Sequence, residues 1–129
     1  TKALIHGDET ASGVVARAWI ARLSKIDPRN TWRVIPIANP DGLKEKTRFN
    51  ARGVDINRNF PTTDWEKDAL DYWRKTTKSD KRRSPGPKAA SEVETNCLSE
   101  FWILTDRIFP RRLGLILGLG NPLEIFLEA

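Results

Sequence analysis

The chain has 129 residues and a mass of 14.7 kDa, enough for one domain with one hydrophobic core. Hydrophobic residues make up 39% and charged residues 30%, and the net charge is +5, a composition typical of a globular protein with a basic surface rather than of a disordered chain. The longest apolar stretch, residues 113–119, is far shorter than the roughly 20 residues of a membrane helix, so we expect no membrane partner. Cys97 is the single cysteine, which excludes an internal disulfide, and we expect a cytoplasmic protein.

Strand and helix patterns alternate along the first half of the chain. Residues 1–5 are typical of a short buried strand, and because this strand opens the sequence directly before its first motif, we expect a trimmed or partial sequence. A helix is predicted from Thr10 to about residue 27, and its core-facing positions at helical spacing are Val14, Val15, Ala18, Trp19 and Leu23. Residues 32–38 predict a second strand, and Asn39-Pro-Asp-Gly42 predicts a turn in which glycine can adopt a positive φ.

The second half predicts two helices separated by a basic loop. Residues 64–74 can form an amphipathic helix, and residues 74–88 are rich in lysine and arginine and end in Pro-Gly-Pro, which is typical of an exposed loop. Ser91-Glu-Val-Glu94 has the spacing of a capping box, so we expect a helix from there to about residue 107. Residues 113–119 predict a third strand. This alternation favours an α/β sheet with parallel neighbours, whose functional loops follow the carboxyl ends of the strands.

A candidate metal pair, His6-x-x-Glu9, directly follows the first predicted strand. An imidazole and a carboxylate three residues apart on a turn can face one point, and zinc accepts both nitrogen and oxygen ligands. The pair alone is weak support for a metal site. Taken by itself, the pair is better explained by a structural histidine and a carboxylate favoured by the helix dipole.

Arginine and asparagine are concentrated between residues 48 and 59. The planar guanidinium of arginine suits bidentate binding of a carboxylate, and Asn57 adds a hydrogen-bond donor on the same short segment. This pattern predicts a site for an anionic peptide terminus. A solvated basic loop is the alternative interpretation.

Together these motifs resemble the zinc carboxypeptidase family, and within it the murein peptide amidase branch. The resemblance is carried by four motifs over residues 2–97, namely His6-Gly-Asp-Glu9, Asn39-Pro-Asp-Gly42, Arg48 and Gly53-Val-Asp-Ile-Asn-Arg-Asn-Phe60. It implies a partial zinc-carboxypeptidase-like α/β fold, with a mixed, mostly parallel twisted sheet flanked by helices. It also implies hydrolysis of a peptide or amide bond near a free carboxylate, with a peptide, such as one derived from peptidoglycan, as the partner.

The resemblance also implies a role for individual residues. His6 and Glu9 correspond to two ligands of one Zn²⁺ ion, and Arg48 to the residue that polarises the scissile carbonyl and stabilises its oxyanion. Asn57 and Arg58 correspond to the pair that binds the terminal carboxylate of the substrate. Zinc would activate a water molecule, and a glutamate would accept its proton.

Two parts of this family pattern are missing from the sequence. The family's third zinc ligand is a second histidine, and His6 is the only histidine present. The family's catalytic glutamate also has no clear counterpart, because Glu124 matches its surroundings only faintly. We therefore expect the ligand set to be incomplete and this chain to be inactive alone. We interpret residues 1–97 as the N-terminal part of the domain and residues 98–129 as a divergent or frameshifted tail.

Two alternative functions follow from the same residues. The first is a non-catalytic remnant that still binds a carboxylate or peptide through Asn57 and Arg58. The second is nucleic-acid binding through residues 74–88, next to Tyr72 and Trp73, which we do not favour because no recognition motif accompanies the charge. We therefore expect no nucleic-acid partner, and the oligomeric state is left open.

Overall fold

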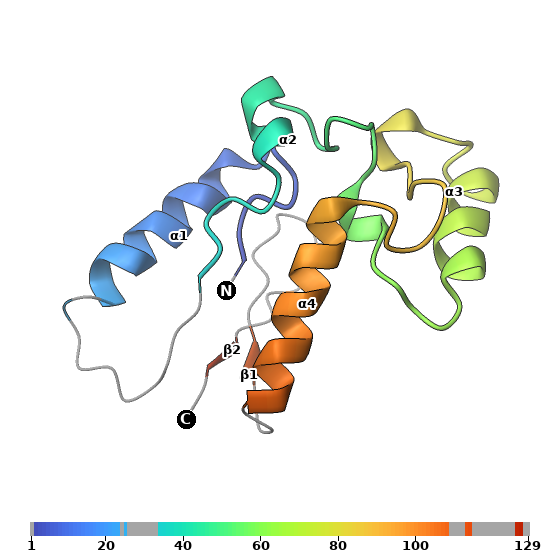
Figure 1. Cartoon of the computed structure of the whole chain (residues 1–129). Helices are drawn as coiled ribbons and strands as arrows, with labels where there is room; N and C mark the ends of the chain where they lie inside the picture. The colour runs from blue at the N-terminus through green and yellow to red at the C-terminus, as the bar shows by residue number, and fades with distance from the viewer. Residues whose placement is uncertain (1, 24, 26–33, 109–112, 115–125, 128–129) are drawn as a thin grey trace.

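The computed structural model describes residues 2–23, 25, 34–108, 113–114 and 126–127, with side chains described up to Phe101. Within these residues the chain is mostly helical (Figure 1). The α-helices are α1 (Thr10–Leu23), α2 (Pro40–Glu45), α3 (Tyr72–Lys75) and α4 (Val93–Ile108). Two 3₁₀-helices, η1 (Ile56–Arg58) and η3 (Lys81–Arg83), and a π-helical segment, η2 (Glu66–Asp71), lie in the connections. The strands are β1 (Leu113–Gly114) and β2 (Phe126–Leu127), which pair antiparallel.

The prediction of an α/β fold with a mixed, mostly parallel sheet is wrong for the described residues. The two predicted N-terminal strands do lie side by side, but they make only one isolated parallel bridge, between Lys2 and Ile35. Beyond the bridge the two segments stay hydrogen-bonded in an irregular register, because Ala38 N donates to Ala3 O and Asn39 N to Leu4 O, each at 2.9 Å, while Leu4 takes a φ of +54°, outside the extended region. Of the predicted third strand, residues 113–114 form β1 and residues 115–119 lie outside the description.

Helix α1 forms where a helix was predicted, but it buries a different face. Its buried residues are the small ones, Ser12, Gly13 and Ala16, whereas Val14 is 59% exposed. Small residues are required because Leu4 packs on the helix. A Cβ atom at Gly13 would lie 2.4 Å from Leu4 Cδ1.

The predicted Asn39-Pro-Asp-Gly42 turn is instead the start of helix α2. The Asn39 side chain caps the helix by accepting a hydrogen bond from the Gly42 N–H at 2.9 Å, and Pro40 occupies the first turn. Gly42 is buried within this helix. The positive φ lies at Lys46, the C-cap, rather than at the glycine.

The predicted helix over residues 64–74 and the predicted basic loop are both found in altered form. The first is a π-helical segment, η2, continued by α3, with Trp65 buried at its start. The basic loop is largely exposed and contains η3. Helix α4 begins two residues after Ser91, whose hydroxyl donates to Glu92 Oε1 at 2.6 Å.

A small apolar cluster joins the segments that carry the candidate site. It consists of Ile5, Ala38, Ile56 and Leu98, with Ile35 and Phe60 packed against it. His6 directly follows Ile5, a member of this cluster, so the His6–Glu9 motif begins where the chain leaves the apolar core. Figure 1 shows the N-terminal segment running between α1 and α4. In the described part of the chain, no helix is long and apolar enough to cross a membrane.

Candidate active site

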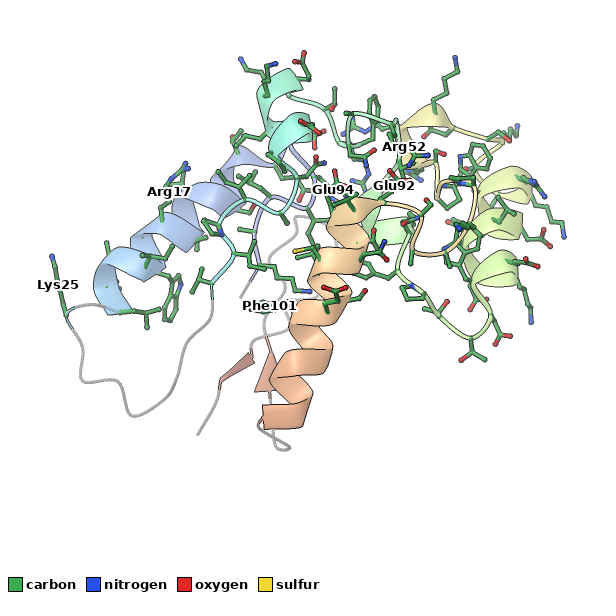
Figure 2. The ribbon with its side chains drawn as sticks, in the orientation of Figure 1. Arg17, Lys25, Arg52, Glu92, Glu94 and Phe101 are labelled. Atoms are coloured by element: carbon green, nitrogen blue, oxygen red, sulfur yellow. The ribbon has the colours of Figure 1, made fainter. Side chains whose placement is uncertain are left out.

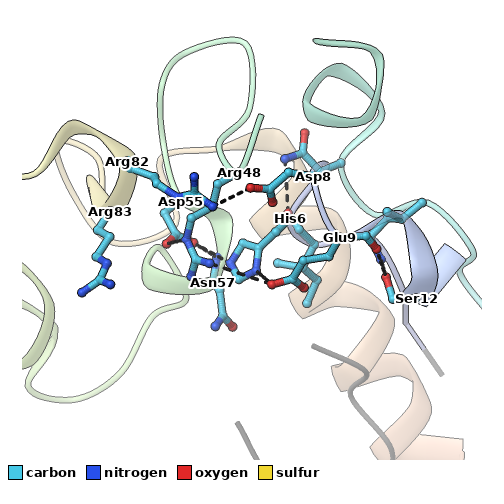
Figure 3. Close-up of polar contacts among 12 residues, drawn as sticks. His6, Asp8, Glu9, Ser12, Arg48, Asp55, Asn57, Arg82 and Arg83 are labelled. Carbon is cyan, nitrogen blue, oxygen red and sulfur yellow. Dashed lines mark hydrogen bonds and ion pairs between the residues drawn. The ribbon is translucent and has the colours of Figure 1, made fainter. Parts of the chain in front are cut away.

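His6 lies between two carboxylates (Figure 3). Its Nδ1 atom is 3.0 Å from Glu9 Oε1, and its Nε2 atom is 3.1 Å from Asp55 Oδ1. The histidine is buried, and Asp55 has no exposed surface. A neutral imidazole has one N–H, so either tautomer leaves a ring lone pair facing a carboxylate oxygen. A cation or a second proton on that side removes the conflict.

Asp55 is the centre of the polar network. Besides His6, it accepts hydrogen bonds from Arg48 Nε at 2.8 Å and from the backbone N–H of Asn57 at 3.1 Å. Burial alone would raise the pKa of Asp55, but the hydrogen bonds and charges of His6 and Arg48 outweigh it and hold the pKa below its ordinary value. Asp55 is therefore an ionised carboxylate that fixes the imidazole and the guanidinium together.

Arg48 also lies beside the candidate metal pair, His6 and Glu9. Its Nη1 atom lies 3.9 Å from Glu9 Oε1, so one arginine contacts both carboxylates that flank His6. The side chains of Arg48 and Glu9 are 17% and 14% exposed, so both are partly accessible to solvent. The structure thus brings together three of the five predicted site residues, His6, Glu9 and Arg48.

The donor atoms of His6 and Glu9 fit two positions of a tetrahedral zinc ion. Two ligands at about 2.0–2.1 Å from tetrahedral zinc lie roughly 3.3 Å apart, and His6 Nδ1 and Glu9 Oε1 are separated by 3.0 Å. The carboxylate on Nε2 matches the outer partner that metal-binding histidines commonly have. In the described residues, no three His, Cys, Asp or Glu side chains are arranged to hold a metal ion, so the pair is a partial site.

Asn57 and Arg58 lie on η1, which is fixed at both ends. Asp55 caps its start by accepting from the Asn57 N–H, and the indole N–H of Trp65 donates to the carbonyl of Arg58 at 2.8 Å. Both predicted binding residues are partly exposed. Within the described residues Arg58 forms hydrogen bonds through its backbone, and its guanidinium takes no part in the His6 network.

A third arginine reaches the site from the basic segment. Arg82, on η3, donates from Nη2 to Asp8 Oδ2 at 2.6 Å, although the two residues are 74 positions apart. Asp8 stands between His6 and Glu9 in the first motif, and its Oδ1 atom is buried with no hydrogen-bond partner in the described structure. The segment is also tied to the site by its backbone, because Ser84 O accepts from Asp55 N at 2.8 Å.

A second polar network supports residues 50–59, the segment that carries Asp55, Asn57 and Arg58. Glu92, almost fully buried at the start of α4, accepts from Asn50 Nδ2 at 2.8 Å and has Arg52 Nε 3.7 Å away. The Asn50 amide also contacts Glu94, and Figure 2 shows Arg52, Glu92 and Glu94 gathered at this end of α4. Asn59 joins the same network, because its side-chain oxygen accepts from Glu92 N. Residues 50–59 are therefore held against α4.

Sequence reasoning gave no role to Asp55 or Arg82, and it found no partner for Asp8. Asp55 lies inside the Gly53–Phe60 motif, and its position between the apolar Val54 and Ile56 is a signal that marks it as a buried carboxylate needing a partner. No sequence signal pairs Arg82 with Asp8, because only the fold brings them together. The candidate base Glu124 lies outside the described residues.

A family profile described as the succinylglutamate desuccinylase/aspartoacylase catalytic domain matches residues 2–95, well over half of the chain. The chain belongs to this family. These are zinc-dependent, zinc-carboxypeptidase-like hydrolases, so the resemblance seen in the sequence motifs is confirmed.

Similar proteins are found among bacterial amidases. Murein peptide amidase A of Escherichia coli K12 is 36% identical over 107 residues, which are 81% of this chain and 42% of the relative. Murein peptide amidase A of Vibrio campbellii is 37% identical over 99 residues, covering 72% of this chain and 38% of the relative. The chain thus spans about two fifths of the length of these relatives. No solved structure matches it.

Proposed function

We propose that this chain carries the first part of a metallopeptidase site of the carboxypeptidase and murein peptide amidase type, which hydrolyses a peptide or amide bond near a free carboxylate. The observation that carries the proposal is the convergence of His6 and Glu9, with Asp55 on the far ring nitrogen of His6. This is the arrangement of a histidine prepared to bind a metal through the atom facing Glu9. The names of the similar amidases support a peptidoglycan-derived peptide as the substrate.

Each residue has a distinct part in the proposed reaction. His6 and Glu9 would hold Zn²⁺, which supplies Lewis-acid activation of a water molecule and of the scissile carbonyl. Asp55 holds the guanidinium of Arg48 beside His6 and Glu9. There the guanidinium would stabilise negative charge that develops on the carbonyl oxygen. Asn57 and Arg58 would bind the terminal carboxylate and so fix which bond is presented.

We expect the chain alone to bind zinc weakly and to be nearly inactive. His6 is its only histidine, so a site that needs two histidines and a glutamate cannot be completed from these residues. The division at residue 97 and a cytoplasmic location stay predictions.

Zinc titration by calorimetry tests the proposed metal pair. We expect one weakly bound ion, and His6→Ala or Glu9→Gln should each lower the affinity at least about tenfold, because each removes a ligand. Glu66→Gln is the matched control, since Glu66 is an exposed acid on η2. Equal affinity in wild type and His6→Ala would contradict the proposal.

A non-catalytic carboxylate-binding remnant is the second candidate function. It is favoured by the rigidity of η1, which Asp55 and Trp65 fix without a metal ion. Wild type should then bind acetyl-trialanine more tightly than its C-terminal amide, and Arg58→Ala should abolish the difference. Unchanged selectivity in that variant would reject this candidate.

A further inference from the structure

The basic segment adds an arginine to the site that the proposed reaction does not use. Arg82 is held beside the first motif by Asp8, yet its side chain is 61% exposed. Asp8 Oδ2 contacts one nitrogen of the guanidinium, which has five N–H donors in a planar fork, so the ion pair orients the group and leaves it accessible. Figure 3 shows Arg82 on the same side of His6 as Arg48.

The backbone fixes Arg82 relative to the proposed carboxylate clamp, Asn57 and Arg58. Helix η3 ends at its C-cap Ser84, whose carbonyl accepts from the N–H of Asp55, and Asp55 is the N-cap of η1. The two arginine-bearing 3₁₀-helices are therefore joined by a hydrogen bond between their adjoining ends. The start of η3 is fixed as well, because Asp80 Oδ1 accepts from Arg82 N at 2.9 Å.

The charges around η3 favour an anionic ligand. Lys81, Arg82 and Arg83 stand against two carboxylates, Asp8 and Asp80, so the edge of the site keeps a net positive charge. Arg83 is only loosely paired, with its Nε 3.8 Å from Asp80 Oδ2. A carboxylate is the group that a fixed, exposed guanidinium recognises best in a peptide.

We propose that Arg82 is a specificity-determining residue that binds a second carboxylate of the substrate, upstream of the terminal carboxylate. This inference rests on the proposed function, because it assumes that Asn57 and Arg58 bind the substrate terminus. The preferred ligand is then a peptide with two carboxylates, one at its C-terminus and one on a nearby side chain.

Binding of matched peptides to the full chain tests the proposal. The probes are acetyl-Ala-Glu-Ala and acetyl-Glu-Ala-Ala, each compared with its glutamine counterpart, which has the same shape and one carboxylate fewer. Wild type should bind at least one of the two glutamate peptides about tenfold more tightly than its glutamine counterpart. This is the effect expected of one added charge-assisted pair. Arg82→Gln should reduce this ratio to about one and leave binding of the glutamine peptide unchanged.

Lys81→Gln is the matched control, because it removes the same charge from the same turn. It should retain the glutamate preference, and an equal loss in both variants would reduce the effect to general electrostatics and overturn the proposal. Equal binding of glutamate and glutamine peptides by wild type would also overturn it, while leaving the proposed clamp intact. Failure of all four peptides to bind would instead contradict the clamp itself.

Discussion

Replacing Asp55 by asparagine tests whether the buried carboxylate holds the site together. The amide has the same shape, and its oxygen can still accept from the Asn57 N–H. Its nitrogen, however, would face Arg48 Nε across the present 2.8 Å contact, so that two donors oppose each other. The substitution therefore removes one charge of a buried ion pair without creating a cavity.

The expected cost to the free energy of unfolding is about 3 kcal/mol, the lower end of the range for removing one partner of a buried ion pair. The lower end applies because Arg48 is 17% exposed and retains Glu9 Oε1 at 3.9 Å. Urea denaturation of both proteins measures the difference. Asp71→Asn is the control. Asp71 forms a solvent-exposed ion pair with Lys75, so its loss should not change the free energy of unfolding measurably.

The pH dependence gives the same prediction an independent check. Because the pKa of Asp55 is lower in the folded chain than in the unfolded one, its contribution is complete above the unfolded value of about 3.9 and is lost as the pH falls through the folded value. The stability gap between wild type and Asp55→Asn should therefore shrink below about pH 4. A gap under about 1 kcal/mol at neutral pH, or one that does not change in acid, would refute the central role of Asp55.

Two further predictions concern the support of the site. Gly7→Ala should destabilise the fold by about 1–3 kcal/mol in urea denaturation, because the new Cβ would lie 1.8 Å from the backbone carbon of Gly42; wild-type stability would contradict this close approach. Burial lowers the pKa of Lys2 to about 8, against an opposing influence from Cys97, so the unfolded chain binds more protons than the folded one between this value and 10.5. Wild type should therefore gain stability over this interval relative to Lys2→Met, and parallel pH profiles would show that Lys2 titrates normally.

Much of the candidate site could be predicted because its signals are local. His6 and Glu9 lie in one turn, and Asn57 and Arg58 in another, so short motifs and their resemblance to the family selected them as candidates, and their roles stay predictions. Asp55 was missed for the opposite reason. Its role depends on a contact with His6, 49 residues away, which the sequence does not display.

The helices and the sheet differed in how far the sequence could predict them. Capping and apolar periodicity located α1 and α4 to within a few residues, since both signals act within the helix. The sheet prediction failed because a strand needs a partner in regular register, and after one bridge the two segments are joined only by irregular hydrogen bonds around Leu4, whose φ is positive. The prediction of which face of α1 is buried was also wrong, because the close packing of Leu4 on Gly13 requires small residues there instead of large apolar ones.

The described residues assemble the site without a continuous sheet, and the apolar cluster explains how. Ile5 and Ile56 belong to the same cluster, and each is the immediate neighbour of a residue in the polar network, His6 and Asp55. Packing of the two isoleucines therefore brings the imidazole and the carboxylate to hydrogen-bond distance. Because apolar contacts are non-directional, this placement needs the ion pair with Arg48 to fix the orientation of the carboxylate. The cluster sets the position of the site and Asp55 sets its geometry, which is why Asp55→Asn should weaken the metal pair even though it removes no ligand.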